Sequence, residues 1–178
     1  MKTYIALIRG INVGGHNKLP MAELRVALED VGLQKVRTYI QSGNVIFQSP
    51  KSVLIALETI ISKVIASIFG FQVPVIVKTP NAIKTILDHC PFSAEEKEKS
   101  HFILLNKVPD KMLVDQVSSL TFEDEYYYII DDCLYFYSSH GYGRTKFNMK
   151  TFEKKLQVVG TSRNYKTMLK LLALSSTE

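Results

Sequence analysis

The sequence contains two cysteines, no tryptophan and no long uncharged apolar run. Cys90 and Cys133 are far apart in the chain, so neither a disulfide framework nor a C-x-x-C metal knuckle is available. We expect both cysteines to be small buried hydrophobic residues. The four histidines show no H-x-x-x-H spacing, which argues against a metal site, and we expect no cofactor.

The apolar stretches are too short or too charged to predict a membrane span. The first run, residues 4–8, ends at Arg9, well short of the apolar core of a signal peptide. The most apolar later stretch, residues 53–69, carries Glu58 and Lys63. We therefore expect a cytoplasmic protein with no membrane partner.

Positive charge is concentrated at the two ends of the 178-residue chain, whose formal net charge is +5. Residues 1–48 carry six Lys/Arg and three Asp/Glu, and residues 141–178 carry eight and two. The middle, residues 49–140, carries eight Lys/Arg and twelve Asp/Glu. Such an asymmetry favours anionic partners through long-range attraction, although a solvated basic face gives the same pattern.

The first 80 residues show a β-α-β-β-α-β pattern. A strand at 4–8 precedes a helix that begins at Pro20 and ends at Gly32. Strands at 36–40 and 45–47 flank a turn at 41–44, in which Gly43 can supply a positive φ. A long helix, 53–68, ends at Gly70 and is followed by a strand at 73–77. This order is the split βαβ pattern of ferredoxin-like domains.

Residues 81–178 show a similar order. A helix at 81–89, a charged turn at 95–99 and a strand at 101–105 precede a helix with Asp110 as N-cap. A hairpin turns at Asp131 and Asp132, and two helical segments separated by Gly160 close the chain. The prediction is an α+β fold in which a ferredoxin-like subdomain, 1–80, packs against a second α+β subdomain, 81–178. The order β-α-β-β-α suggests that the second is related to the first.

Two polar segments are predicted to meet at one edge of the first sheet. If strand 4–8 runs upward, the turn at 41–44 lies at the same edge as the loop at 10–18. The loop offers five donor side chains, namely Arg9, Asn12, His16, Asn17 and Lys18. The backbone N–H groups of Gly14 and Gly15 could form a nest. The N-terminus of the first helix adds partial positive charge, so these features suit an anion.

Named phosphate-binding loops do not fit this segment. Gly10 and Gly15 have the spacing of a P-loop, but His16 and Asn17 stand where Lys and Ser/Thr are required. Asn12 stands at the position that the middle glycine takes in the dinucleotide-binding motif. Two interpretations stay open: an anion-binding loop, or glycines that serve chain geometry alone.

Two further basic polar segments occur late in the chain. The first, G-Y-G-R-T-K at 141–146, carries Arg144 and Lys146. The second, G-T-S-R-N-Y-K-T at 160–167, is predicted to be a loop and N-cap of the final helix, with Thr161 or Ser162 as the cap. It carries Arg163 beside these hydroxyls.

The sequence shows no strong motif for catalysis or for the stacking of nucleic-acid bases on aromatic side chains. Neither cysteine has an evident partner base, and Asp131 and Asp132 are neighbours in a turn, which argues against paired acid–base chemistry. The hairpin at 126–137 is rich in tyrosine, as are RNA-recognition sheets, but the aromatic RNA-binding strand motif is absent. Cross-strand packing over a core is therefore favoured over base stacking.

Four motifs together resemble a bacterial family catalogued as domain of unknown function 1697. They read YIALIRGINVGGHNKLPMAEL, RTYIQSGNVIF, YGRTKF and TSRNYKT. The resemblance implies a ferredoxin-like first half and a small cytoplasmic protein, with no established activity. The family typically has Lys at position 16 and Trp at 165, and Asn or Arg at 166. The family's motif residues correspond to Arg9, Gly10, Asn12, Gly14, Gly15, Asn17, Lys18, Ser42, Gly43, Asn44, Gly143, Arg144, Lys146, Arg163 and Asn164.

The leading hypothesis is a binding module for a phosphate-bearing ligand, either a nucleotide or a nucleic acid. Charged side chains would contact the phosphate and Asn12, Asn44 and Asn164 would orient it. An enzyme that stabilises charge on a small anionic metabolite, and a scaffold for an acidic protein partner, are the alternatives. The predicted ligand-binding residues are Arg9, Gly10, Asn12, Gly14, Gly15, Asn17, Lys18, Ser42, Asn44, Arg144, Lys146, Arg163 and Asn164.

Overall fold

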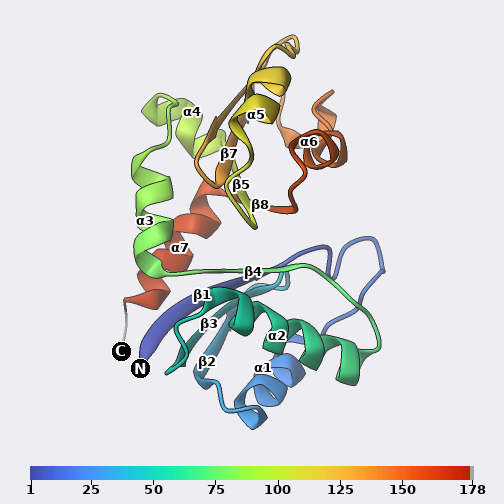
Figure 1. The fold of residues 1–178 in the computed structure, drawn as a ribbon, viewed down its shortest axis with the longest axis vertical. Helices are drawn as coiled ribbons and strands as arrows, with labels where there is room; N and C mark the ends of the chain where they lie inside the picture. Colours follow the sequence, from blue (N-terminus) through green and yellow to red (C-terminus); the bar gives the residue numbers. More distant parts are fainter. Residues whose placement is uncertain (177–178) are drawn as a thin grey trace. The chain divides into compact units, whose positions relative to one another are not determined.

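A computed structural model describes residues 1–176 of the chain (Figure 1). The chain divides into two compact units. The first unit comprises Met1–Lys84 together with the chain from Lys170 onward, and the second comprises Thr85–Leu169. No helix within residues 1–176 combines the length and apolar character needed to cross a membrane.

The first unit is built on one antiparallel four-stranded sheet. The strands lie in the order β2-β3-β1-β4, so β3 separates the two strands that α1 connects. This is the split βαβ arrangement, and the ferredoxin-like prediction for the first half is confirmed. The elements are β1 Lys2–Ile8, α1 Met21–Asp30, β2 Gln34–Tyr39, β3 Asn44–Ser49, α2 Leu54–Phe69 and β4 Val75–Lys78.

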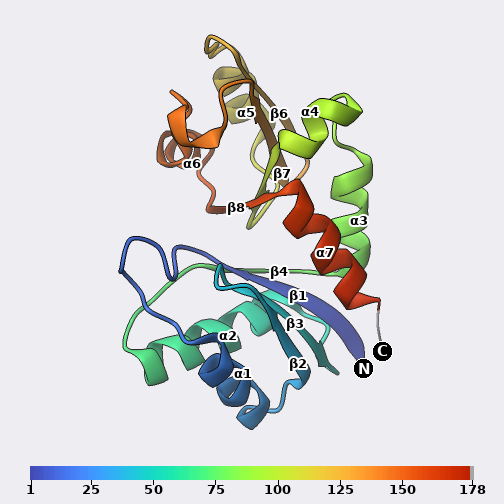
Figure 2. The ribbon, with the colours of Figure 1, turned by 180° about the vertical axis from the view of Figure 1, so that it is seen from behind.

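The core of the first unit lies between the sheet and its two helices. Helices α1 and α2 cover the same face of the sheet (Figures 1 and 2). Side chains alternate along a strand, so Tyr4, Ala6 and Ile8 of β1 enter this core together with Phe47 of β3. Helix α2 ends at Gly70, which has a left-handed φ of 78° as its position predicted.

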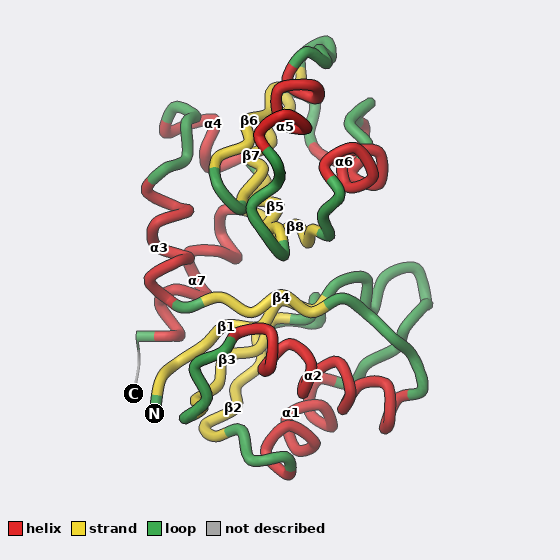
Figure 3. The backbone as a smooth tube through the Cα atoms, in the orientation of Figure 1, coloured by secondary structure: helices red, strands yellow, loops and turns green. Residues whose placement is uncertain are grey.

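The second unit repeats the same topology. Its sheet has the order β6-β7-β5-β8, which corresponds strand for strand to β2-β3-β1-β4 (Figure 3). The hypothesis of a second ferredoxin-like fold is therefore confirmed. The elements are β5 His101–Leu105, α5 Lys111–Ser118, β6 Glu125–Ile130, β7 Cys133–Ser138, the short 3-10 helix η1 Tyr142–Arg144, α6 Met149–Leu156 and β8 Gly160–Asn164.

Strand β8 corrects the prediction of a loop at 160–167. Its sequence, GTSRN, has no apolar alternation, so the strand is recognisable only from its pairing with β5. Thr161 lies opposite Leu104, and Arg163 lies opposite Phe102. A Cβ on Gly160 would come within 2.9 Å of Ile103 Cγ2, so the strand begins where only glycine fits.

The prediction of a charged turn at 95–99 is also wrong, because this segment forms helix α4 (Ala94–Lys99). Ser93 accepts a hydrogen bond from the Glu96 N–H, and the Glu96 carboxylate accepts one from the Ser93 N–H at 3.1 Å. This capping box has a sequence signature, Ser followed three residues later by Glu, that marks a helix start.

Two helices contain the boundaries between the units. Helix α3, Pro80–Asp88, begins in the first unit, and α7, Tyr165–Ser175, ends in it. Arg37 of β2 donates to the Leu174 carbonyl oxygen at 2.5 Å, which ties the last turn of α7 to the first sheet. The C-terminal residues thus belong to the first unit and not to the expected 81–178 subdomain.

The turn between β2 and β3 passes very close to the end of β1. Gly43 has a φ of 78°, and a Cβ there would lie 2.7 Å from the Ile8 carbonyl oxygen and 2.9 Å from Ile8 Cβ. The Ile8 N–H donates to the Gly43 carbonyl oxygen at 2.8 Å. This approach requires a residue with no side chain and a tolerance for positive φ.

We predict that Gly43→Ala destabilises the protein by more than about 1 kcal/mol, because strain at positive φ is combined with backbone overlap. Urea unfolding measures the change. Gly10→Ala is the matched control, since Gly10 also has a positive φ (65°) but no atom within 4 Å of the added Cβ. Equal losses in the two variants would show that the close approach contributes nothing.

Candidate functional site

The loop between β1 and α1 and the turn between β2 and β3 meet at one edge of the first sheet. Asn12 of the loop donates from Nδ2 to the carbonyl oxygen of Gln41 in the turn at 2.9 Å. This contact confirms the predicted convergence of the two polar segments. Ile11 and Leu19 are buried in the core of the first unit, so residues 12–18 project from two fixed points.

The projecting part of the loop is a small hairpin. Val13 and His16 pair, with a hydrogen bond from the His16 N–H to the Val13 carbonyl oxygen at 3.1 Å. Gly14 and Gly15, at the tip, have φ values of 58° and 78°. A two-residue turn with positive φ at both central positions favours glycine at each. The geometry of the turn therefore explains why both positions are glycine, and their N–H groups lie at an exposed tip.

Three asparagines at this edge hold the backbone in place. Asn12 donates to the Leu19 carbonyl oxygen at 2.9 Å as well as to Gln41, and its Oδ1 accepts from the Leu19 N–H at 2.8 Å. Asn17 donates to the Gly10 carbonyl oxygen at 3.0 Å. Buried Asn44 donates to the Tyr39 carbonyl oxygen and to Ser42 Oγ. These amides clamp the loop and the turn, whereas Asn12 and Asn44 were expected to orient a ligand.

The cationic groups of this edge come from the loop. Arg9 is half-buried at the end of β1, and its N–H donates to the Pro74 carbonyl oxygen at 3.0 Å. His16 and Lys18 are exposed on the hairpin. Helix α1 begins two residues after Leu19, and its N-cap, Pro20, provides no side-chain hydrogen bond. The first N–H groups of α1 therefore lie next to the loop without a side-chain cap.

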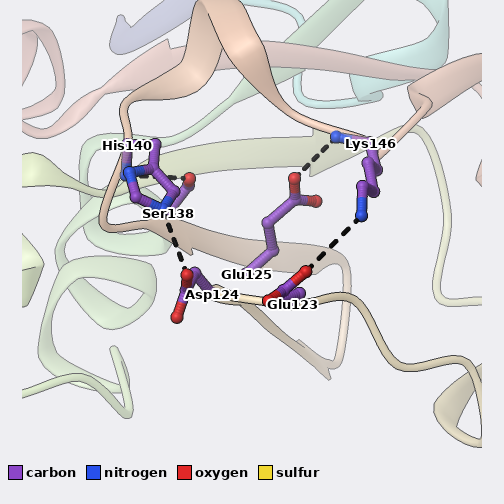
Figure 4. A network of polar contacts seen from close by, with 6 residues as sticks. All are labelled: Glu123, Asp124, Glu125, Ser138, His140 and Lys146. Atoms are coloured by element: carbon purple, nitrogen blue, oxygen red, sulfur yellow. Dashed lines mark hydrogen bonds and ion pairs between the residues drawn. The ribbon is translucent and has the colours of Figure 1, made fainter.

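The basic segment 141–146 lies in the second unit beside acidic residues (Figure 4). The Lys146 ammonium is 3.8 Å from Glu123 Oε2. Its backbone N–H donates to Glu125 Oε1 at 2.6 Å, and Phe147 donates to Oε2 at 2.8 Å. Buried Glu125 thus fixes this segment. Glu125 directly precedes the tyrosines of β6, and no sequence motif there predicts that its carboxylate accepts hydrogen bonds from residues 146 and 147.

These acidic neighbours reduce the positive charge that Lys146 can offer to an anion. The side chain of Arg144 lies outside the described part of the structure. The ligand-binding roles of both residues stay predictions.

Arg163 and Asn164 lie on β8 and not in a loop. Arg163 is only 7% exposed, and it donates to Thr161 Oγ1 at 2.8 Å and to the Ser162 carbonyl oxygen at 2.7 Å. Burial lowers the pKa of its guanidinium to about 10. Asn164 Oδ1 accepts from the Thr167 N–H at 2.9 Å and so caps α7, the role predicted for Thr161 or Ser162.

The described residues offer no assembled catalytic group. Ser138, His140 and Asp124 are neighbours, but Ser138 Oγ accepts from the backbone N–H of His140, while the ring Nε2 lies 3.1 Å from Asp124 Oδ2. The serine therefore has no base on its hydroxyl (Figure 4). Within residues 1–176, no three His, Cys, Asp or Glu side chains are grouped to hold a metal. Cys133 is buried as predicted, and Cys90 is half-buried.

We predict that Asn12→Asp destabilises the protein by about 1–3 kcal/mol, because two carbonyl oxygens lose their donor while the positive φ of Asn12 stays accessible. Hydrogen exchange should accelerate selectively at residues 12–19. Exchange rates equal to those of the unmodified protein across the loop would show that Asn12 does not hold it.

The comparisons with known proteins give a family and a solved relative. The family model described as "Protein of unknown function (DUF1697)" matches residues 1–135. A conserved bacterial protein from Streptococcus pneumoniae, SP0830, has a similar solved structure, with a TM-score of 0.77, 29% identity and 98% coverage of both chains. A comparison with curated proteins gives no match. The family match covers well over half of the sequence, and the chain therefore belongs to the DUF1697 family.

Proposed function

We propose that the protein binds a phosphate-bearing ligand, a nucleotide or a single-stranded nucleic acid, at the loop edge of the first unit. The residues that contact it are Arg9, the Gly14–Gly15 tip, and Lys18, with the N-terminus of α1 and Ser42 nearby.

Charge carries the proposal. The residues of the first unit include eleven Lys/Arg and five Asp/Glu, a formal net charge of +6. Those of the second unit include eleven Lys/Arg and twelve Asp/Glu, a net charge of −1. The excess positive charge of the whole chain therefore belongs to the unit that contains the loop, and it would attract a polyanion toward that unit.

Rigidity of the loop adds to this support. Asn12, Asn17 and the buried side chains of Ile11 and Leu19 hold the loop in one conformation. A ligand that binds there has little backbone entropy to overcome. The N–H groups at the exposed tip are suited to phosphate oxygens, because amides donate hydrogen bonds to them. The dipole of α1 also favours negative charge at the start of the helix, where the first turn carries Glu23. The loop offers no nucleophile or general base with a partner, which favours binding over turnover.

We predict that Lys18→Ala weakens binding of a fluorescein-labelled oligothymidylate by about tenfold, the cost of one charge-assisted hydrogen bond. The slope of log affinity against log salt should also become shallower by about 0.7, because one fewer phosphate is neutralised on a single strand. Fluorescence anisotropy at several salt concentrations measures both quantities.

Lys63→Ala is the matched control, since Lys63 is an exposed lysine of the same unit on α2. It removes the same charge and should reduce affinity far less. A competition experiment with a nucleoside triphosphate distinguishes the two ligand classes. Only a site for a mononucleotide would release the oligonucleotide when the triphosphate is added at a concentration equal to that of the protein. Equal effects of the two lysine variants, or binding independent of salt, would contradict the proposal.

A further inference from the structure

The second unit contains a sheet edge, strand β6, that is not part of the site proposed above. Strand β6 is at the end of the order β6-β7-β5-β8, so its outer side pairs with no other strand among residues 1–176. An isolated antiparallel bridge joins Glu125, at the start of β6, to Phe122, and the rest of this edge is open to a partner. A groove of about 420 Å³ runs along this edge. The groove is lined by β6 and by the segment that follows α5, including Leu120 and Phe122.

The hydrogen-bonding groups that face outward can be identified from the pairing with β7. The Ser139 N–H donates to the Asp124 carbonyl oxygen, and the two-residue turn at Asp131 and Asp132 closes between Ile130 and Cys133. Hydrogen-bonded positions alternate along an antiparallel strand, so the even-numbered residues of β6 bond to β7. The N–H and C=O groups of Tyr127 and Ile129 therefore point away from the sheet.

The side chains on this edge are apolar or aromatic and only partly covered. Tyr126 is 52% exposed and Tyr128 is 49% exposed, on the face opposite the core of α5 and α6. Tyr126 stacks on Tyr137, with ring centroids 6.3 Å apart. Ile129 is half-buried on the other face. A strand with free peptide groups and large apolar side chains is a template for a further strand.

Carboxylates flank the strand at both ends and favour a partner with positive charge at its ends. Exposed Glu123 and Asp124 precede β6, and exposed Asp131 follows it. The Lys146 ammonium contacts Glu123, so the negative charge at the N-terminal end is partly compensated, and the His140 ring contacts Asp124. Exposed Asp131 adds a carboxylate at the other end of the strand, and the flank as a whole stays acidic.

A second copy of the chain is a poor occupant of this edge. Two β6 strands related by a two-fold axis run antiparallel, and residues that face each other must lie on the same side of the sheet. With Tyr128 opposite itself, Glu125 faces Asp131 and Asp124 faces Asp132. With Tyr127 opposite itself, Glu123 faces Asp131. These two registers oppose like charges, which destabilises the pairing. Residues 121–133 contain no Lys or Arg, so no register of two β6 strands pairs opposite charges.

We propose that β6 binds an extended segment of a partner protein that carries Lys or Arg at both ends and alternating apolar side chains between them. The segment adds a fifth strand to the sheet by hydrogen bonding to Tyr127 and Ile129. Its basic ends meet Glu123, Asp124 and Asp131, and its apolar side chains enter the groove beside Leu120 and Phe122. Tyr126 and Tyr128 offer ring faces to its cations.

The probe is a synthetic peptide of three Thr-Val repeats with two lysines at each end, and the full-length protein is titrated with it. Binding should slow hydrogen exchange at the amides of Tyr127 and Ile129. The same peptide with glutamates at its ends should bind at least about tenfold more weakly, because like charges are then opposed. Methylation of the valine amides should abolish binding, because it removes backbone donors.

Two variants of the protein make the test specific. Ile129→Pro removes one outward N–H at an edge position where proline is tolerated, and it should weaken binding of the lysine peptide by about fivefold or more. The double variant Glu123→Gln with Asp131→Asn keeps the strand intact and should reduce the preference for lysine over glutamate ends. It also keeps the test valid if the proline variant is unstable.

Equal binding of the lysine and glutamate peptides, or slowed exchange at residues other than those of β6, would overturn the proposal. A concentration-dependent dimer that places β6 at its interface would also overturn it. The oligonucleotide experiment on Lys18 is independent, because it concerns the first unit.

Discussion

The contact between the β2–β3 turn and the end of β1 is the constraint on which the candidate site depends. Gly43 lies against the Ile8 backbone at a distance that no side chain allows. This contact fixes where the turn stands relative to the start of the loop. Asn12 then joins the two segments through Gln41 and closes the loop through Leu19. The polar edge is thus a property of backbone packing.

The same topology is used twice, with different surfaces. The first unit has a net charge of +6 and a rigid loop at one edge of its sheet. The second has a net charge of −1, a tyrosine-rich edge strand and acidic residues at the ends of that strand. In our two proposals, the first ferredoxin-like unit binds an anion and the second binds a basic polypeptide. Because fold does not determine function, these surfaces and not the topology carry the two proposals.

Much of the fold could be predicted from the sequence, because its signals are local. Buried runs marked β1 and β5, and Gly70 marked the end of α2 through its left-handed φ. Strand β8 could not be predicted, since its polar residues form a strand only by pairing with β5. Helix α4 was missed although Ser93 and Glu96 carry a capping signature.

The candidate site was predictable in its position and not in its details. Chain direction alone placed the loop and the turn at one edge. The amide of Asn12 was expected to orient a ligand, whereas it binds backbone groups of Leu19 and Gln41. Such contacts depend on atoms that are distant in sequence. The same holds for Glu125, whose carboxylate accepts from the N–H groups of Lys146 and Phe147.

We propose that the phosphate groups of the ligand bind at the loop edge of the first unit. The most direct measurement is the map of backbone amide chemical-shift changes when the full-length protein is titrated with a short oligothymidylate. We predict that the largest changes occur at Gly14, Gly15, Lys18 and the first turn of α1. Changes confined to the second unit, or the absence of saturable changes at the loop, would contradict it.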